Sequence, residues 1–132
     1  MKFMMMMHTP RGTGDYQINQ WTPAALNAHI QFMKDLNRDL QKSGEFVEAQ
    51  GLTPPGQAKI VKYASSGPIV SDGPFAESKE FLAGFWIIEV DKRERAYEIA
   101  SRASSAPGPD GKPLVISIEL REVMGAPLPD GA

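Results

Sequence analysis

The sequence predicts one α+β domain in which two helices pack on one face of a mainly antiparallel sheet. Three observations predict it. Apolar residues recur at helical spacing over residues 22–43, a strand that is apolar on both faces occupies residues 82–90, and the elements follow the order strand, helix, strands, helix, strand. The length of 132 residues suits a single domain. A ferredoxin-like arrangement is the expected result.

The first strand and the first helix follow from short-range patterns. Residues 2–8 read Lys-Phe-Met-Met-Met-Met-His, and turn-forming residues follow at 9–15, so we expect a short buried strand. Thr22 can cap the next helix, and Pro23 suits its first turn. Gly44 is expected to end this helix. Its apolar stripe consists of Leu26, Ile30, Met33, Leu36 and Leu40.

The middle of the chain contains further strands. Residues 46–50 and 59–64 are predicted strands, and short apolar residues at 69–71 follow a turn. The strand at 82–90 places Phe85 and Ile87 on one face, whereas its other face carries Trp86, Ile88 and Val90. A strand of this kind is covered on both sides. Because two helices cover one face, a second copy of the chain is the simplest cover, and we expect a homodimer.

The second helix and the last strand complete the prediction. Asp91 and Glu94 form a variant of the capping box, and small apolar residues continue at helical spacing to about residue 104. Alternation over 114–123 predicts the final strand. The loop at 104–112 and the tail are rich in Pro and Gly and are expected to tolerate change. We therefore expect a folded domain over 1–124 and a flexible tail over 125–132.

Composition excludes several classes of function. With 14 basic and 16 acidic residues the net charge is −2, which lacks the basic footprint of nucleic-acid binding. No cysteine is present, so thiolate nucleophiles, disulfides and cysteine zinc sites are excluded. With two histidines, no metal or cofactor is expected. No stretch approaches the roughly 18 apolar residues of a membrane helix, and we expect a cytoplasmic protein without a membrane partner.

The two histidines are the first candidates for chemistry. His29 lies on or beside the apolar stripe of the first helix. It is either a histidine at the edge of the core that is hydrogen-bonded to the backbone, or a general acid and base, because its ordinary pKa lies near neutrality. His8 is a weaker candidate, because no acid lies near it in the sequence.

The most distinctive tetrapeptide is Asp72-Gly73-Pro74-Phe75. Asp-Gly favours a turn, and the following proline stiffens it. The tetrapeptide is either a rigid turn and nothing more, or a turn that holds the Asp72 carboxylate or the Phe75 ring at the mouth of a pocket. A carboxylate near His29 would fix its tautomer and raise its basicity. Phosphate-binding glycine loops and the Gly-x-Ser-x-Gly nucleophile motif do not occur.

Residues 70–80, Val-Ser-Asp-Gly-Pro-Phe-Ala-Glu-Ser-Lys-Glu, followed by Gly-Phe-Trp-Ile-Ile-Glu at 84–89, resemble the signature block of the DGPF type of YCII-related proteins. The start at 1–4, the Ala28-His29 pair and the ending at 118–123 are similar to the same family. The resemblance implies a ferredoxin-like fold that pairs into a dimeric α+β barrel. It also implies a pocket between helix and sheet in each subunit.

The resemblance extends to candidate site residues. In the wider YciI-like family a histidine on the first helix and an aspartate are proposed as a catalytic pair, and His29 matches that histidine. The YciI branch has an Asp-Pro pair after the last helix, whereas this chain has Ala106-Pro107. Asp72 is therefore a substitute candidate, and we expect it to approach His29 at one pocket, with Phe75 and Phe85 near the wall.

Three functions stay open at this point. The first is a dimer with a pocket for an unknown small molecule, using His29 and Asp72 for acid–base chemistry. The second is a non-catalytic ligand-binding or regulatory module, because the resemblance links DGPF proteins functionally to extracytoplasmic-function sigma factors. The third is a purely structural dimer, which requires a packed His29 and no cavity.

Overall fold

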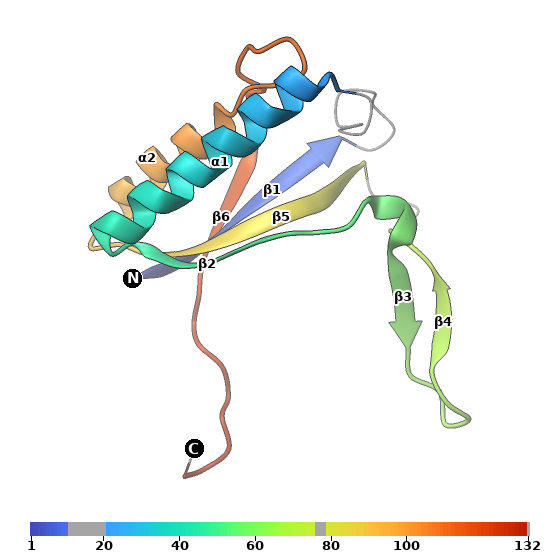
Figure 1. The fold of residues 1–132 in the computed structure, drawn as a ribbon. Helices are drawn as coiled ribbons and strands as arrows, with labels where there is room; N and C mark the ends of the chain where they lie inside the picture. The colour runs from blue at the N-terminus through green and yellow to red at the C-terminus, as the bar shows by residue number, and fades with distance from the viewer. Residues whose placement is uncertain (11–20, 76–78, 132) are drawn as a thin grey trace.

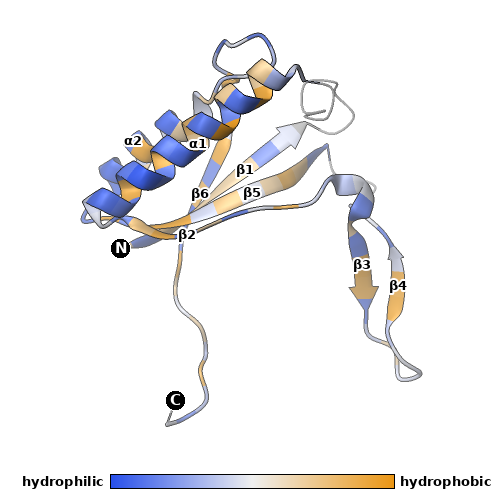
Figure 2. Cartoon of the chain, viewed as in Figure 1, coloured by the Kyte–Doolittle hydropathy of each residue, from blue (hydrophilic) through white to orange (hydrophobic). Residues whose placement is uncertain are grey.

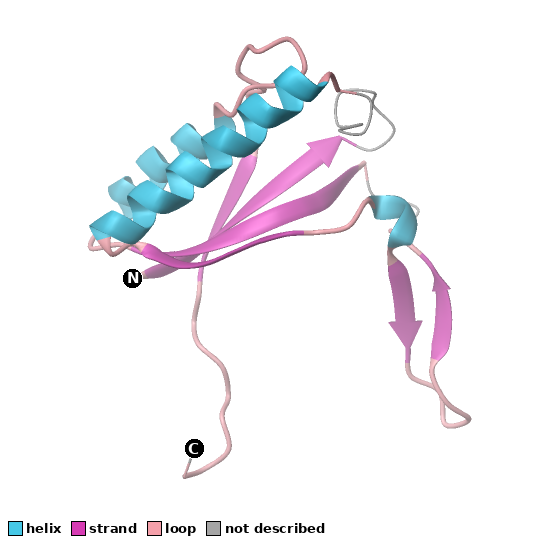
Figure 3. Ribbon diagram, in the orientation of Figure 1, coloured by secondary structure: helices cyan, strands magenta, loops and turns pink. Residues whose placement is uncertain are grey.

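Two helices lie across one face of a four-stranded antiparallel sheet (Figure 1). The structure is a computed structural model, and it describes residues 1–10, 21–75 and 79–131. Figure 3 shows the helices gathered on a single side of the strands. The predicted α+β class, with both helices on one sheet face, is confirmed. The strand predicted over 2–8 continues to Pro10, so the first two residues of the turn predicted at 9–15 belong to that strand, and residues 11–15 lie outside the described residues.

The sheet has the strand order β2-β5-β1-β6. The central strands are β1 (Lys2–Pro10) and β5 (Glu80–Glu89), and the edges are β2 (Phe46–Gly51) and β6 (Ile118–Glu122). All three pairings are antiparallel. The first strand of the chain therefore lies in the middle of the sheet, bonded on both sides to strands that come much later in the sequence.

The methionine run forms β1, as predicted, against its intrinsic preference for helix. Alternation directs Phe3, Met5 and Met7 into the core, where all three are buried. Met4 and Met6 point to the opposite face and are half-buried. Hydrogen bonding to two neighbouring strands outweighs the local preference, because a central strand satisfies its backbone groups on both edges.

The long helix α1 (Pro23–Ser43) begins and ends where the sequence predicts. The Thr22 hydroxyl accepts a hydrogen bond from the Ala25 amide at 3.2 Å, and Gly44 ends the helix with a left-handed φ of 79°. Leu36 and Leu40 are fully buried against the sheet. The helix therefore presents a fixed face to β1 and β5.

The second helix, α2 (Arg93–Ser104), packs through small residues. Its buried positions are Ala96, Ile99, Ala100 and Ala103. The predicted capping box at Asp91 and Glu94 is wrong. The cap position is Lys92, and its side chain makes no capping hydrogen bond. Burial of the alanine stripe thus positions this helix without a side-chain cap.

The last strand is shorter than the predicted 114–123. Residues 114–117 are not part of the sheet, because their amides bond to the end of α2 instead. The Leu114 amide donates to the Ala106 carbonyl at 2.9 Å, and the Ile116 amide donates to the Ser104 carbonyl at 3.3 Å. Val115 between them has a positive φ of 55°. The loop at 104–112, which the sequence predicts to tolerate change, is therefore hydrogen-bonded at its start to residues 114–117. Its residue Ala106 is fully buried.

A separate hairpin projects away from the domain (Figure 1). It consists of β3 (Lys59–Lys62) and β4 (Ile69–Asp72), preceded by the short 3-10 helix η3 (Pro55–Gln57). We call residues 59–72 the hairpin arm. The strand predicted over 59–64 ends at Lys62. Figure 2 shows apolar stretches on both strands of the arm, although both strands are largely exposed.

The tail after β6 runs away from the sheet on the side opposite the helices (Figure 1). Residues 123–131 are exposed, and Met124 is completely so. Within the parts of the chain that the structure describes, no helix combines the length and the apolar character needed to cross a membrane.

One ion pair connects the start of β2 to α2. The Arg95 guanidinium donates to both carboxylate oxygens of Glu45, at 2.8 and 2.9 Å. This hydrogen bonding lowers the pKa of the Glu45 carboxyl below its ordinary 4.5, and it raises the pKa of Arg95. Glu45 is mostly shielded from solvent, so the pair is screened less than a surface pair.

We expect this pair to make stability depend on acid pH. Because the folded-state pKa of Glu45 is lowered, its contribution is complete above about pH 4.5 and is lost as the pH falls through the folded value. Changing Glu45 to Gln should cost about 1 kcal/mol of unfolding free energy at pH 7 and less at pH 3. Urea denaturation at both pH values measures this difference. An equal loss at both values would contradict it.

Candidate functional site

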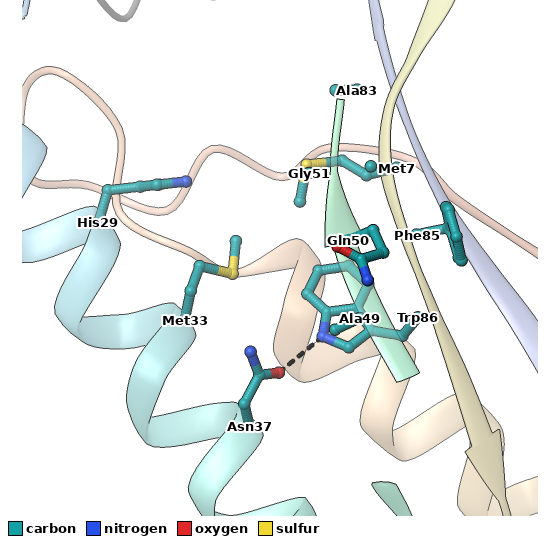
Figure 4. Close-up of a pocket in the computed structure, with 11 residues that line it drawn as sticks. Met7, His29, Met33, Asn37, Ala49, Gln50, Gly51, Ala83, Phe85 and Trp86 are labelled. Atoms are coloured by element: carbon teal, nitrogen blue, oxygen red, sulfur yellow. Dashed lines mark hydrogen bonds between the residues drawn. The ribbon is translucent and has the colours of Figure 1, made fainter. Parts of the chain in front are cut away.

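A pocket of about 220 Å³ lies between α1 and the sheet (Figure 4). Three elements, α1, β2 and β5, supply most of its wall, and β1 adds one methionine. The residues that line it are Met7, His29, Met33, Asn37, Ala49, Gln50, Gly51, Ala83, Gly84, Phe85 and Trp86. Such a position between helix and sheet is the one that the sequence resemblance implies.

The helix contributes a single stripe to the pocket. His29, Met33 and Asn37 are spaced four residues apart, so they lie one above another on the same face of α1. Figure 4 shows all three side chains directed away from the helix toward the strands. Once His29 is a candidate, this spacing places Asn37 on the same face of the helix. Nothing in the sequence around Asn37 marks it as a site residue, so the sequence alone does not identify it.

His29 is held by two contacts. Its Nδ1 lies 2.9 Å from the carbonyl oxygen of Pro107, and the ring of Trp21 meets it edge-on at 5.3 Å between centroids. A carbonyl oxygen only accepts, so Nδ1 carries the proton. In the neutral ring Nε2 is then an unprotonated acceptor. Figure 4 shows the imidazole pointing into the pocket.

A second hydrogen bond fixes the other end of the stripe. The buried Trp86 indole Nε1 donates to Asn37 Oδ1 at 2.8 Å (Figure 4). An indole nitrogen only donates, so it selects the amide oxygen of Asn37 and leaves the amide nitrogen directed elsewhere. The loop carbonyl and the indole thus determine which atoms His29 and Asn37 offer to the pocket.

The strands approach closely at the far wall. A Cβ atom placed on Gly84 would lie 2.9 Å from the carbonyl oxygen of Gln50 on the paired strand β2. No real side chain tolerates that contact with backbone. The glycine in the segment that resembles the signature block therefore has a structural role beside the pocket.

The predicted site residues are distributed over two regions. Both His29 and Phe85 border the pocket, but the Phe85 ring lies across β5 from His29 (Figure 4). Asp72 and Phe75 are not among the lining residues. The Asp72 carboxylate is 89% exposed. It lies where β4 ends, opposite the start of β3, and bonds to Lys59 Nζ at 2.6 Å. Phe75 is 62% exposed.

Within one chain, therefore, Asp72 is engaged with Lys59 rather than with His29. The pairing of Asp72 with His29 stays a prediction that requires another arrangement of the arm. Residues 76–78 of the signature-like segment lie outside the described residues. Where the structure describes the chain, no group of three His, Cys, Asp or Glu side chains is arranged to hold a metal ion.

The histidine that does meet a carboxylate is His8. Its Nε2 lies 2.9 Å from Glu119 Oε1, across the pairing of β1 with β6. His8 is the weaker candidate on sequence grounds, because no acid is near it in the chain. The partner is 111 positions away, and only the strand pairing brings the two together. This pair is partly exposed and lies outside the pocket.

Comparison with known proteins places the chain in a family. Residues 1–107 match the model of the YCII-related domain, which is most of the chain. The chain belongs to the YCII-related family. The chain is also similar to an uncharacterized protein of Rhizobium meliloti (strain 1021), with 34% identity over 77 residues. That match covers 56% of this chain and 62% of the relative, so the chain spans less than two thirds of the relative's length.

We expect the change Asp72→Asn to leave the NMR titration curve of the His29 ring superimposable on that of the wild type. The reason is that Asp72 bonds to Lys59 on the arm. The change Lys59→Met serves as the matched control, because it removes the bonding partner of Asp72 and keeps the Asp72 carboxylate. A displaced His29 curve in Asp72→Asn would show that the two groups are coupled.

Proposed function

We propose that this YCII-related protein binds a small molecule in the pocket beneath α1, with His29 Nε2 as the acceptor that meets it. The observation that carries the proposal is the hydrogen bond between His29 Nδ1 and the Pro107 carbonyl. A histidine that only packs at the edge of the core also needs a hydrogen-bond partner, but here the same bond turns Nε2 toward the pocket, which His29 lines, and this orientation supports binding. The pocket also argues against a purely structural dimer, which requires none.

Orientation by a carbonyl favours binding over catalysis. The YciI branch has an acid at the position that resembles Ala106, and here the next carbonyl orients the imidazole instead. A carbonyl fixes the tautomer, but it stabilises a developing imidazolium less than a carboxylate does. We therefore place a non-catalytic, ligand-binding role first. Its regulatory form, with a functional link to an extracytoplasmic-function sigma factor, rests on the family resemblance.

Acid–base chemistry is the second candidate function. It requires a carboxylate within reach of His29, and Asp72 would have to come from the arm of a second copy. The observation that favours it is the exposure of the arm, whose Asp72 carboxylate is 89% exposed and bonds to Lys59 of the same arm. In that arrangement the titration experiment above would give a displaced His29 curve.

A homodimer is proposed from the uncovered face of the sheet. Opposite the helices, the half-buried side chains of Met4, Met6, Phe85 and Ile87 form an apolar centre on β1 and β5. The edge strands surround it with exposed polar residues, among them Glu48, Gln50, Glu119 and Arg121. An apolar centre with a polar rim is the usual anatomy of an interface. The arm and the tail project on this same side (Figure 1).

We expect light scattering coupled to size exclusion to give twice the 14.5 kDa chain mass at micromolar concentration. Replacing Ile87 with Lys should shift the protein to the monomer, because the charge would be buried at the centre of the contact. The control is Ile30→Lys on the exposed side of α1, which makes the same substitution on the helix side of the sheet, away from the proposed contact. A monomeric wild type would contradict the proposal.

Binding in the pocket is tested by NMR of methyl-labelled methionine. Methyl 4-hydroxybenzoate, a single-ring probe, should shift the methyl signals of Met7 and Met33, which line the pocket, and leave Met124 unchanged. Changing His29 to Asn should weaken binding about tenfold, since one hydrogen bond to the ligand is lost.

The matched control is His8→Asn, which removes the other histidine outside the pocket. Its affinity for the probe should equal that of the wild type. Equal affinity of the His29→Asn variant, with an unchanged melting temperature, would overturn the role of His29. Shifts confined to Met4 and Met6 would place the ligand on the other sheet face.

A further inference from the structure

We infer that the ligand of the pocket is an uncharged, elongated molecule about the size of one substituted ring, with a hydrogen-bond donor at one end and an acceptor at the other. This inference rests on the proposed function and adds the ligand's chemical class. Three observations carry it. They are the fixed amide of Asn37, the fixed tautomer of His29, and the lack of fixed charge on the wall.

The donor of the pocket is the amide nitrogen of Asn37. An asparagine side chain alone can turn either atom toward a ligand, but here the indole of Trp86 holds Oδ1 at 2.8 Å. The nitrogen then has two hydrogens to donate, and within the described parts of the chain no partner accepts them. A ligand carbonyl or ether oxygen matches this end.

The acceptor is Nε2 of His29. Its ring is bonded through Nδ1 to Pro107, so in the neutral state the pocket meets a lone pair. A hydroxyl or amide N–H of the ligand matches this end. The Asn37 amide nitrogen thus requires an acceptor on the ligand, and His29 Nε2 requires a donor. A ligand with two acceptors or two donors satisfies only one of these two atoms.

The spacing sets the shape of the ligand. His29 and Asn37 are eight residues apart, which is about 12 Å along the helix axis between their Cα atoms. The thioether of Met33 lies between them on the same face, and Met7 approaches from β1 (Figure 4). A cavity on the order of 150 Å³ holds benzene. The pocket of about 220 Å³ therefore suits one ring with a short substituent that extends it.

The wall also selects for the absence of charge. Among the described residues that line the pocket there is no Lys, Arg, Asp or Glu. An ammonium ligand would leave water without a charged partner, which is strongly unfavourable, and a carboxylate would find one only if His29 took up a proton and ceased to be an acceptor. The soft, polarizable methionine side chains suit an aromatic or other apolar ring.

Four probes of one shape separate these requirements. Methyl 4-hydroxybenzoate has the hydroxyl donor and the ester acceptor, and it is uncharged at pH 7. Its acid, 4-hydroxybenzoate, adds a charge. Methyl 4-methoxybenzoate lacks the donor, and 4-ethylphenol lacks the carbonyl. Titration calorimetry should give the highest affinity for the first probe. Each of the other three should bind about tenfold more weakly, or weaker still for the anion.

The variant Asn37→Asp isolates the donor. The carboxylate keeps an acceptor for the Trp86 indole, so the fold is retained, but the amide hydrogens are gone. Affinity for methyl 4-hydroxybenzoate should fall about tenfold or more, whereas 4-ethylphenol, which lacks the carbonyl, should lose less. Asn27→Asp, on an exposed position of the same helix, is the matched control and should bind all four probes as the wild type does.

The outcomes distinguish the two levels of the proposal. The inferred ligand class would be overturned if 4-hydroxybenzoate bound most tightly, or if Asn37→Asp bound methyl 4-hydroxybenzoate as tightly as the wild type does. Either result would leave a His29-dependent pocket. Loss of that same selectivity in the Asn27→Asp control would also count against it. Failure of all four probes to shift the Met7 and Met33 methyl signals would overturn the pocket itself.

Discussion

The antiparallel pairing of β1 with β5 is the contact on which the rest of the structure depends. It joins the start of the chain to residues 80–89, and the register places Met5 opposite Trp86 on the helix side. That pair is buried under the two helices together with Leu36 and Ile88. Because side chains alternate along a strand, the same pairing decides which residues face the pocket and which face away.

If β5 slipped by one residue against β1, the two faces of β5 would be exchanged. Trp86 would leave the helices and could no longer donate to Asn37, and Phe85 and Ile87 of the outer face would turn inward. Tight packing at Gly84 opposes such a slip, since a Cβ there collides with the neighbouring strand. The register of the sheet and the chemistry of the pocket are therefore set by one constraint.

Much of this arrangement is readable from the sequence, for local reasons. Thr22, Pro23 and Gly44 mark the ends of α1 because caps depend on neighbouring residues. The two-faced strand at 82–90 is readable because alternation is a local pattern. The segment 114–117 is not, because alternation assigns it to a strand, whereas the amides of Leu114 and Ile116 bond to carbonyls at and just after the end of α2. Similarly, His29 is identified by helical spacing, but the Pro107 carbonyl and the Glu119 partner of His8 depend on distant contacts.

The hairpin arm occupies an unusual place in the topology. The strands on either side of it, β2 and β5, are adjacent in the sheet, and Gly51 already pairs with Gly84. The hairpin arm is thus an excursion between two neighbouring strands, and its two strands pair with each other in a sheet of their own. In evolution such an excursion can lengthen, shorten or change its sequence while the sheet and its pocket persist. Divergence among related proteins would then accumulate at residues 59–69 of the arm, ahead of the segment that resembles the family signature, and contacts there could change without redesigning the fold.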